Sequence, residues 1–310
     1  MRQEKNIEEF LKKNEFRFFK NKNLSEYTTF RLKSVAPYVV EILSYEELTI
    51  ILNYFIKQEI KYVLLGGGSN VVFISERIDC VVIVNKTSGI NLNDEYIEID
   101  SGVRNSNFLN FCVKNSISGF EFLSGIPGTI GGAVAVNAGA FGKSISEMVM
   151  EAVIINKSAN IKRINNNDFN FEYRNSRFKT SDEVILRIYF KYEKGNSDYI
   201  SSKIKKYYEY RKNNHPSYDE FSAGCFFKNP LIDGQKISAG KLIDQVGLRG
   251  FEYKGFKISE KHANFLLNKN NSGFKELKEF EQLIKKKVKE KKGINFDREV
   301  IYIDKKGSKL

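Results

Sequence analysis

The stretch that decides the fold lies at residues 124–142 and reads SGIPGTIGGAVAVNAGAFG. It contains no charged side chain, and glycine or alanine fills roughly half of its positions. Glycine tolerates the turn conformations in which consecutive backbone N–H groups point into one concavity. Such a row of donors binds an anion, most often a phosphate, without a basic side chain. The same composition also suits a tight strand–turn–helix packed against a neighbouring element.

A second glycine-rich loop lies upstream, at residues 64–70, and reads LLGGGSN. Apolar residues at helical spacing predict a helix over about 45–58, introduced by a capping box at 44–47. A short buried strand at 62–65 then delivers the loop. This order predicts a β-α-β unit with the loop at the carboxyl end of a strand, where ligands usually bind.

Two familiar phosphate loops are excluded. Gly142, Lys143 and Ser144 resemble the end of a P-loop, but the upstream position that requires glycine is Asn137. The loop at 66–70 resembles a Rossmann fingerprint, but its third glycine position is Val71. We therefore expect a nucleotide-like ligand to be held by neither route.

Composition indicates a folded chain. The 310 residues are enough for two or three packed units, and 41% hydrophobic content with 25 phenylalanines argues against disorder. The charged segment 1–13 lacks the apolar run of a secretory signal. The sequence also contains no apolar stretch of about 18 residues, which is the length needed to span a membrane. We expect a cytoplasmic protein that does not use a membrane.

Cysteine and histidine usage argues against disulfides and metal sites. Cys80, Cys112 and Cys225 are odd in number and far apart, which is typical of free thiols in a reducing compartment. The chain has two histidines, His215 and His262, and no Cys-x-x-Cys pair, so we expect no metal.

A net charge of +12 leaves a nucleic-acid-binding function as an alternative. The densest basic cluster comprises Lys285, Lys286, Lys287, Lys289, Lys291 and Lys292. Because aromatic residues are not interleaved with these lysines, the solvated face of an amphipathic helix is the better interpretation. We expect no nucleic-acid partner.

The remaining pattern alternates strands and helices. We predict strands at 81–84, 96–99, 148–155, 184–192 and 297–303, and a further strand after 261–263. Predicted helices cover part of 7–19, then 105–115, 197–212 with Ser197 as cap, a short helix at 238–244 ended by Gly247, and 273–292 stopped by Gly293. A domain boundary is expected near 195–200.

Motifs that follow one another along the chain carry a family resemblance. The two glycine loops are followed by Tyr173-Arg174-x-Ser176, Ala223-Gly224-Cys225-x-Phe227-Lys228-Asn229-Pro230, Lys261-His262-Ala263 and Asp297-Arg298-Glu299-Val300. Singly each is weak, but in this order they resemble the UDP-N-acetylenolpyruvoylglucosamine reductase (MurB) family over nearly the whole chain. That family is flavin-dependent.

The resemblance implies an α+β protein with the vanillyl-alcohol-oxidase/PCMH-like FAD-binding fold. It implies an FAD-binding subdomain at 1–84 joined by a C-terminal strand at 298–310. A second FAD-binding subdomain at 85–196 and a C-terminal α+β substrate-binding domain at 197–297 complete the expected organisation.

The resemblance also implies FAD and NADPH as cofactors. The implied reaction is the reduction of UDP-N-acetylglucosamine enolpyruvate to UDP-N-acetylmuramate, a precursor of peptidoglycan. The protein would thereby take part in cell-wall biogenesis and cell division. The implied cofactor-binding residues are Gly66, Gly67, Gly68, Ser69, Asn70, Gly125, Ile126, Pro127, Gly128, Thr129, Gly132 and Asn137. Another FAD oxidoreductase of the same superfamily is the alternative.

Three catalytic residues follow from the resemblance. In this reaction negative charge develops on the enolpyruvyl carboxylate, and Arg174 matches the residue that meets it, as a fixed cationic fork does best. Glu299 matches an acid that orients or protonates C2. At the proton-donor position many members have serine, whereas this chain has Cys225, whose thiol is a far stronger acid than an alkyl hydroxyl. Without the resemblance, these residues could equally be a surface arginine, a solvated carboxylate and a buried thiol.

Tyr173, Lys228, Asn229 and His262 match substrate-binding positions, although a lone histidine is more often structural. Only about 30 residues separate Tyr192 from Cys225, too few for the inserted tyrosine loop of some members, so the chain resembles the shorter type. We expect a monomer.

Overall fold

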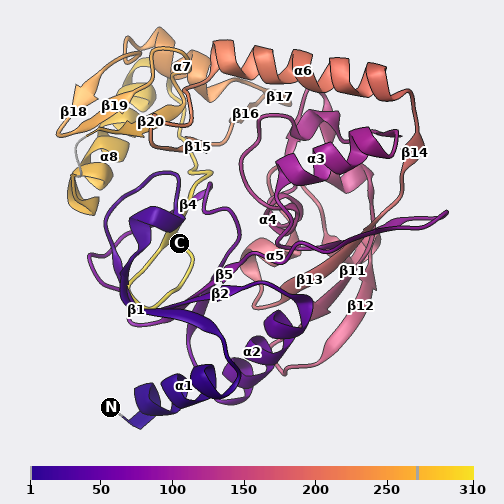
Figure 1. The fold of residues 1–310 in the computed structure, drawn as a ribbon. Helices are drawn as coiled ribbons and strands as arrows, with labels where there is room; N and C mark the ends of the chain where they lie inside the picture. The colour runs from indigo at the N-terminus through magenta and orange to yellow at the C-terminus, as the bar shows by residue number, and fades with distance from the viewer. Residues whose placement is uncertain (1, 270–271) are drawn as a thin grey trace. The chain divides into compact units, whose positions relative to one another are not determined.

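The computed structural model describes residues 2–269 and 272–310 (Figure 1). Contacts divide the chain into two compact units. The first comprises the residues up to Lys22, 36–67 and 79–208, and the second comprises 23–35, 68–78 and 209 onward. The second unit thus takes in two segments of the range 1–84; the three predicted domain ranges stay a prediction.

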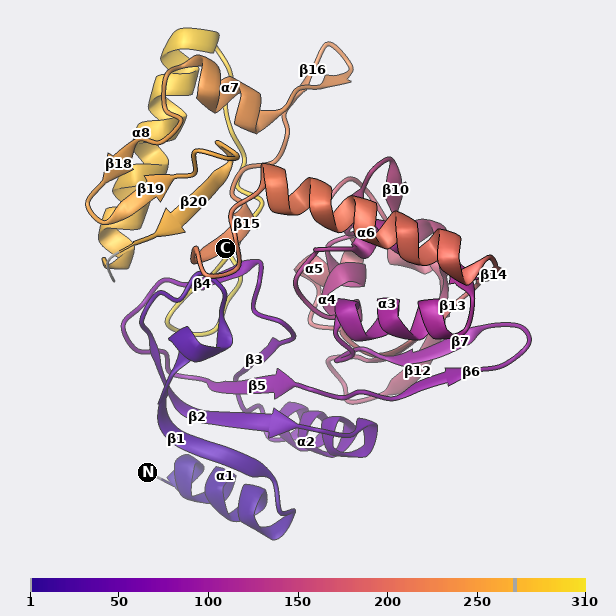
Figure 2. The ribbon, with the colours of Figure 1, turned by 45° about the horizontal axis from the view of Figure 1, so that its top comes forward.

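The first unit contains the predicted β-α-β arrangement. Its four-stranded sheet has the order β1 (Arg17–Asn23), β2 (Val35–Ile42), β5 (Val81–Asn85) and β3 (Tyr62–Leu65). Both β2 and β3 run parallel to β5, and α2 (Tyr45–Lys57) connects them. Helix α1 (Arg2–Lys13) and α2 flank this sheet in Figure 2. Leu11, Ile51 and Phe55 pack with Val40 and Ile83 into its core.

Helix α2 begins at the predicted cap, but the capping box is incomplete. The Ser44 hydroxyl accepts a hydrogen bond from the Glu47 amide at 3.1 Å, which satisfies one free donor of the first turn. The Glu47 carboxylate accepts from the Leu43 amide at 2.7 Å instead of from Ser44. The prediction of a reciprocal box was therefore wrong by one residue.

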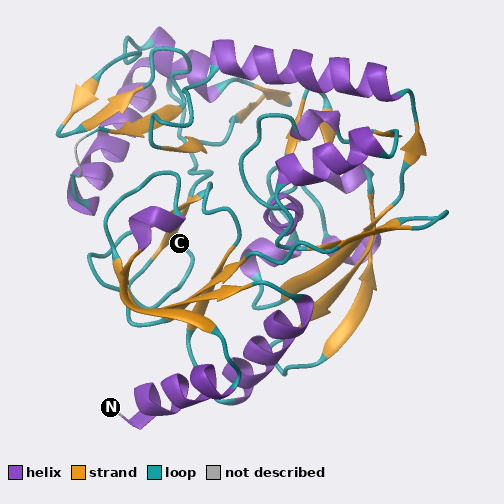
Figure 3. Ribbon diagram, viewed as in Figure 1, coloured by secondary structure: helices purple, strands orange, loops and turns teal. Residues whose placement is uncertain are grey.

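A second, antiparallel sheet completes the first unit. Its order is β12 (Ile161–Asn165), β11 (Val149–Ile155), β13 (Val184–Phe190), β7 (Ile97–Asp100) and β6 (Ile90–Leu92). Helices α3 (Asn105–Lys114) and α4 (Ile130–Ala135) share a core with it that includes Phe108, Val134 and Ile188. Figure 3 shows how much loop surrounds α4. The short elements here are β8 (Ile117–Ser118), η2 (Glu121–Leu123), β9 (Gly139–Ala140), β10 (Lys143–Ser144), η3 (Ile145–Glu147), η4 (Asn166–Phe169), α5 (Arg177–Thr180) and β14 (Glu193–Lys194).

The second unit is built on a sheet of order β15 (Ser222–Cys225), β20 (Phe265–Asn268), β19 (Phe256–Ile258) and β18 (Glu252–Tyr253). Helices α7 (Ala239–Gln245) and α8 (Phe274–Lys292) contribute Leu242, Ile243, Leu277 and Phe280 to its core. Strand β21 (Ile301–Ile303) pairs in parallel with β4 (Val71–Phe73). The unit also contains η1 (Leu24–Tyr27) and the hairpin of β16 (Leu231–Ile232) and β17 (Gln235–Lys236).

Two predicted boundaries differ from the structure. Helix α6 (Ser197–Asn214) is capped by Asn196, whose side chain accepts from the Tyr199 amide at 2.9 Å. The Ser197 hydroxyl donates to the Val113 carbonyl instead, so Ser197 is not the cap. The final strand covers β21 alone, because the residues before it turn toward another segment, where Arg298 bridges with Phe227.

The predicted ends of two other helices are confirmed. Helix α8 ends at Gly293, which has a left-handed φ of 70°, and α7 is followed by Gly247 at φ 80°. Both glycines occupy a conformation that other residues rarely adopt. Among the described residues, no helix is long and apolar enough to cross a bilayer.

Candidate functional site

The two glycine-rich loops meet within the first unit. A Cβ added to Gly67 would lie 2.5 Å from the Gly128 Cα, and one added to Gly66 would lie 2.3 Å from the Thr129 hydroxyl. Any side chain at these positions would push the loops apart. The glycines of both loops are therefore needed for this close backbone contact, whose partners lie about 60 positions apart in the sequence.

The contact leaves backbone donors available. Within the part of the chain that the structure describes, no backbone carbonyl accepts from the amides of Gly67, Gly128 or Thr129. The next amides are used internally: Ile130 donates to Val103, and Gly131 donates to Ser101. The candidate anion-binding donors therefore belong to Gly67 and to the turn before α4. Because residues 124–142 carry no carboxylate that would repel a phosphate, these backbone donors are compatible with a diphosphate, so the residues present fit the phosphate portion of FAD.

The rest of the first loop belongs to the second unit. Gly68 has a φ of 62°, and its carbonyl accepts from the Thr29 amide at 3.0 Å. The Asn70 carbonyl accepts from the Ile301 amide at 3.0 Å, next to β21. Ser69 lies between these two anchors. The loop predicted as one cofactor-binding element is thus divided between units after Gly67.

The remaining cofactor candidates hold the second loop in place. The Ile126 carbonyl accepts from the Asn105 side chain at 3.1 Å, between Gly125 and Pro127. The Gly132 amide donates to the Thr129 hydroxyl at 3.3 Å. Asn137 is buried with a φ of 46°, and its side chain donates to the Glu172 carbonyl at 2.9 Å. Its amide is therefore engaged with the protein.

Arg174 is hydrogen-bonded to the C-terminal part of the glycine-rich stretch 124–142. Its guanidinium donates to the Gly139 carbonyl at 2.7 Å and to the Asn137 carbonyl at 3.4 Å. It lies 5.2 Å from the centre of the Tyr173 ring, and Ser176 donates to the Ala135 carbonyl at 2.7 Å. Carbonyl oxygens orient a guanidinium without neutralising its charge. Arg174 is therefore a half-buried cation fixed beside the glycine-rich stretch.

Cys225 and Glu299 are brought close through their backbones in the second unit. Glu299 donates its amide to the Phe226 carbonyl at 2.9 Å, and Phe227 forms an antiparallel bridge with Arg298. Cys225 itself closes β15 opposite Phe265 and is partly exposed. The structure thus places the thiol-bearing and carboxylate-bearing residues on neighbouring backbone segments. Arg174 belongs to the first unit.

Asn264 is a residue that the sequence analysis did not single out. Its side chain accepts from the Phe227 amide at 3.0 Å and donates to the Phe227 carbonyl at 2.8 Å. Its position within a recognised motif, directly after Ala263, was the available signal. Nothing in the neighbouring sequence indicated that its side chain would form hydrogen bonds with the backbone of Phe227.

The predicted substrate-binding residues of the second unit have intramolecular partners. The Lys228 amide donates to the Asp297 carbonyl at 2.9 Å, and the Asn229 side chain accepts from the Ala239 amide at 2.9 Å. The His262 ring stacks on His215 with centres 5.1 Å apart. Burial lowers the pKa of His262, so its ring favours the neutral form.

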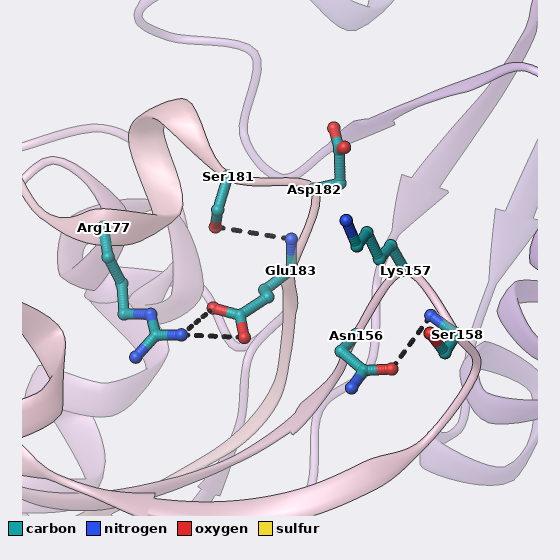
Figure 4. A pocket seen from close by; sticks show the side chains of 7 residues that line it. All are labelled: Asn156, Lys157, Ser158, Arg177, Ser181, Asp182 and Glu183. Carbon is teal, nitrogen blue, oxygen red and sulfur yellow. Dashed lines mark hydrogen bonds and ion pairs between the residues drawn. The ribbon is translucent and has the colours of Figure 1, made fainter.

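A hollow of about 370 Å³ lies elsewhere in the first unit (Figure 4). Its lining comprises Asn156, Lys157, Ser158, Arg177, Ser181, Asp182 and Glu183. Arg177 and Glu183 form an ion pair of 2.7 Å across it. None of the predicted site residues lines this hollow.

Comparisons with known proteins cover nearly the whole chain. A family model for the C-terminal domain of UDP-N-acetylenolpyruvoylglucosamine reductase matches residues 215–303, and one for an FAD binding domain matches 36–165. The reductase of Caldanaerobacter subterraneus is 31% identical over 97% of both chains. That of Chlamydia felis is 36% identical over 89% of this chain and 91% of its own.

A solved structure agrees with these matches. The UDP-N-acetylenolpyruvylglucosamine reductase of Thermus caldophilus superposes with a TM-score of 0.74 at 26% identity, covering 93% of this chain and 98% of its own. The predicted α+β architecture with the vanillyl-alcohol-oxidase/PCMH-like FAD-binding fold is confirmed.

Proposed function

The chain belongs to the UDP-N-acetylenolpyruvoylglucosamine reductase family, and from this premise we propose how its residues carry out the reaction. It is an FAD oxidoreductase that reduces the enolpyruvyl sugar nucleotide in peptidoglycan precursor synthesis. We propose NADPH as the reductant and UDP-N-acetylmuramate as the product. The contact between Gly67 and Gly128 carries the proposal, because it brings together backbone amides that no backbone carbonyl of the described residues accepts from.

Residues of both glycine loops hold the cofactor. The amides of Gly67, Gly128 and Thr129 would donate to the diphosphate of FAD, since an anion is best bound by donors that have no internal acceptor. The remaining residues at 66–70, 125–127, 132 and 137 shape this loop pair. When bound, FAD carries hydride from NADPH to the enolpyruvyl group.

Arg174 stabilises the negative charge that develops on the substrate carboxylate. Hydride adds to C3 of the enolpyruvyl double bond, and the electron pair of that bond moves toward C2 and the carboxylate. A guanidinium already held by the carbonyls of Asn137 and Gly139 needs little rearrangement as this charge appears. Tyr173 supports it through its ring.

Cys225 donates the proton that completes the reaction at C2. Its thiol S–H bond breaks, the C2–H bond forms, and solvent reprotonates the thiolate before the next turnover. Glu299, on the neighbouring segment, orients the reacting carbon or assists this proton transfer. Lys228, Asn229 and His262 contribute to binding of the sugar nucleotide.

We propose further that the protein acts in the cytoplasm as a monomer and without a nucleic-acid partner. The last of these proposals, that no nucleic acid is bound, is supported by α8, where basic side chains have contacts within the protein. Lys285 pairs with Glu281 at 2.7 Å, and the Lys291 ammonium donates to the Val246 carbonyl at 3.3 Å.

Replacement of Cys225 tests the proposed function. The purified protein should be yellow and should oxidise NADPH when the enolpyruvyl sugar nucleotide is added. Cys225→Ala should bind flavin and accept hydride normally yet reduce the enolpyruvyl group very slowly. Cys225→Ser should keep measurable activity and extend it to more alkaline pH, because a donor must be protonated and a hydroxyl stays so.

A colourless protein that takes up no flavin on reconstitution would contradict the cofactor assignment. Turnover of Cys225→Ala at the parent rate would exclude the thiol as donor. Glu299 acting through water would then take its place.

A further inference from the structure

We propose that Asn264 is a positioning residue that sets the distance between the Cys225 thiol and the Glu299 segment. The inference rests on the proposed roles of Cys225 and Glu299. It assigns to Asn264 no contact with the substrate. Its effect passes through the backbone of residues 226 and 227.

Three hydrogen bonds join Asn264 to this backbone. The Asn264 side chain accepts from the Phe227 amide at 3.0 Å and donates to the Phe227 carbonyl at 2.8 Å. Its own carbonyl accepts from the Phe226 amide at 2.7 Å. The side chain is nearly inaccessible, at 1% exposure, so water does not compete for these bonds. One buried residue therefore fixes the three successive peptide groups that follow Cys225.

The opposite edge of the same backbone faces the Glu299 segment. The Phe226 carbonyl accepts from the Glu299 amide at 2.9 Å, and the Lys228 amide donates to the Asp297 carbonyl at 2.9 Å. Residues 226–228 thus lie between Asn264 and 297–299, with bonds to each. A change at Asn264 displaces the segment that links the thiol to the carboxylate.

The local irregularity explains why a side chain is needed here. The register between β15 and β20 shifts between Ser222 and Cys225, and Gly224 has a φ of 80°. The regular ladder ends at Cys225, and strand pairing does not satisfy the amide and carbonyl of Phe227, which bond to the Asn264 side chain instead. A carboxamide carries both a donor and an acceptor and replaces the missing strand partner. Its removal leaves two buried polar groups unsatisfied, which is costly.

His262 holds Asn264 in turn. The His262 Nδ1 atom accepts a hydrogen bond from the backbone amide of Asn264 at 3.3 Å. The ring proton of neutral His262 is therefore assigned to Nε2. The His262 ring packs against both His215 and Phe265, which also contact each other. His262 thereby influences the Cys225 turn through Asn264, in addition to any contact with substrate.

Thiol alkylation and amide exchange test the proposal without relying on turnover. Cys80 and Cys112 are buried at 2% and 1% exposure, so iodoacetamide should report on Cys225, with Cys225→Ser as the blank. In Asn264→Ala, we expect the Phe227 amide to exchange at least about tenfold faster than in the parent. We also expect the alkylation rate to change by about threefold or more and kcat to fall about tenfold, with KM for the enolpyruvyl substrate within about twofold.

The matched control is Asn156→Ala, which also removes two hydrogen bonds between a side chain and the backbone, in this case from the amides of Ser158 and Asn160 at 3.0 Å. It should leave the alkylation rate, Phe227 exchange and kcat unchanged. Asn264→Asp keeps the shape and the acceptor but loses the donor, and should give the same changes in a protein that still folds.

Unchanged alkylation and exchange in both Asn264 variants would overturn the proposal. The proposal would also be overturned if kcat fell only in proportion to a loss of thermal stability. Tm values of the Asn264 variants and of Asn156→Ala measure that loss. If the parent bound no flavin and did not turn over, the proposed function would fall, whereas alkylation and exchange would still decide whether Asn264 holds the turn.

Discussion

At the residue scale, glycine at the loop contact is required for steric reasons. Gly67 and Gly128 touch through their backbones, and Gly128 has a φ of 132°, which L side chains rarely adopt. This contact cannot be reproduced by alanine or serine. The proposed cofactor site therefore depends on two positions that carry no side chain at all.

Gly128→Val should remove bound FAD from a protein that remains folded. A β-branched side chain at this φ strains the loop whose backbone contacts Gly67. The ratio of flavin to protein absorbance measures the effect. Gly142→Asn is the control, because Gly142 also has a positive φ but its missing side chain would meet nothing within 4 Å. Full flavin occupancy in Gly128→Val would mean that the loop is only a packing turn.

Arg174→Ala and Glu299→Gln should separate the two halves of the reaction. Flavin reduction by NADPH should stay nearly intact, while reoxidation by the enolpyruvyl substrate slows by a factor of hundreds. Loss of one preorganised charge contact typically costs about 3–4 kcal/mol in the transition state. Stopped-flow absorbance follows both steps.

Arg177→Ala provides the matched control for Arg174. Arg177 lies three positions away but pairs with Glu183 at 2.7 Å, so both half-reactions should match the parent. Equal slowing of both steps in Arg174→Ala would instead assign that arginine to structure or to FAD binding.

At the scale of elements, the end of α6 depends on a pair of neutral histidines. Burial, with smaller contributions from Arg211 and His262, lowers the pKa of His215 from an ordinary value near 6.5 to about 4. The folded protein thus binds fewer protons than the unfolded chain between these pH values. Stability from the neutral ring is complete above pH 6.5 and falls as pH decreases toward 4.

His215→Phe should therefore reduce the acid sensitivity of the fold. Between pH 6.5 and 4, the parent should lose on the order of 1 kcal/mol more stability than the variant, because partial exposure of His215 screens the effect. Denaturant titrations at several pH values measure this difference. Identical pH dependence in the two proteins would exclude the buried neutral ring as its source.

At the scale of the whole molecule, the last strand completes structure formed early in the chain. Strand β21 pairs with β4, which directly follows the first glycine loop, and Tyr302 is buried at 3% exposure. The Tyr302 hydroxyl donates to Glu281 in α8 at 2.7 Å. The second unit therefore combines segments from both ends of the sequence.

Deletion of 301–310 should destabilise the protein by more than about 3 kcal/mol, since it removes a buried aromatic side chain and the partner of β4. Deletion of 305–310 keeps β21 and should cost much less. Thermal unfolding of both truncations compares them. Equal Tm values would show that β21 contributes little to the second unit.

The sequence alone determined the features set by short-range pattern. The spacing of Leu48, Ile51, Leu52 and Phe55 located α2, and Gly293 located the end of α8, because helical periodicity and stop signals act within a few residues. The family and fold followed from ordered motifs. The sequence did not determine which of two neighbouring residues, Asn196 or Ser197, caps α6, because both side chains can cap a helix.

Only the tertiary structure decided which distant groups meet. The contact of Gly67 with Gly128, the carbonyls that orient Arg174 and the bonds of Asn264 to Phe227 join residues 35 to 61 positions apart. Local propensity carries no information about such pairs, because they form when separate elements pack. The division of the loop at 66–70 between two units has the same origin. Each half bonds to segments that lie far away in the sequence.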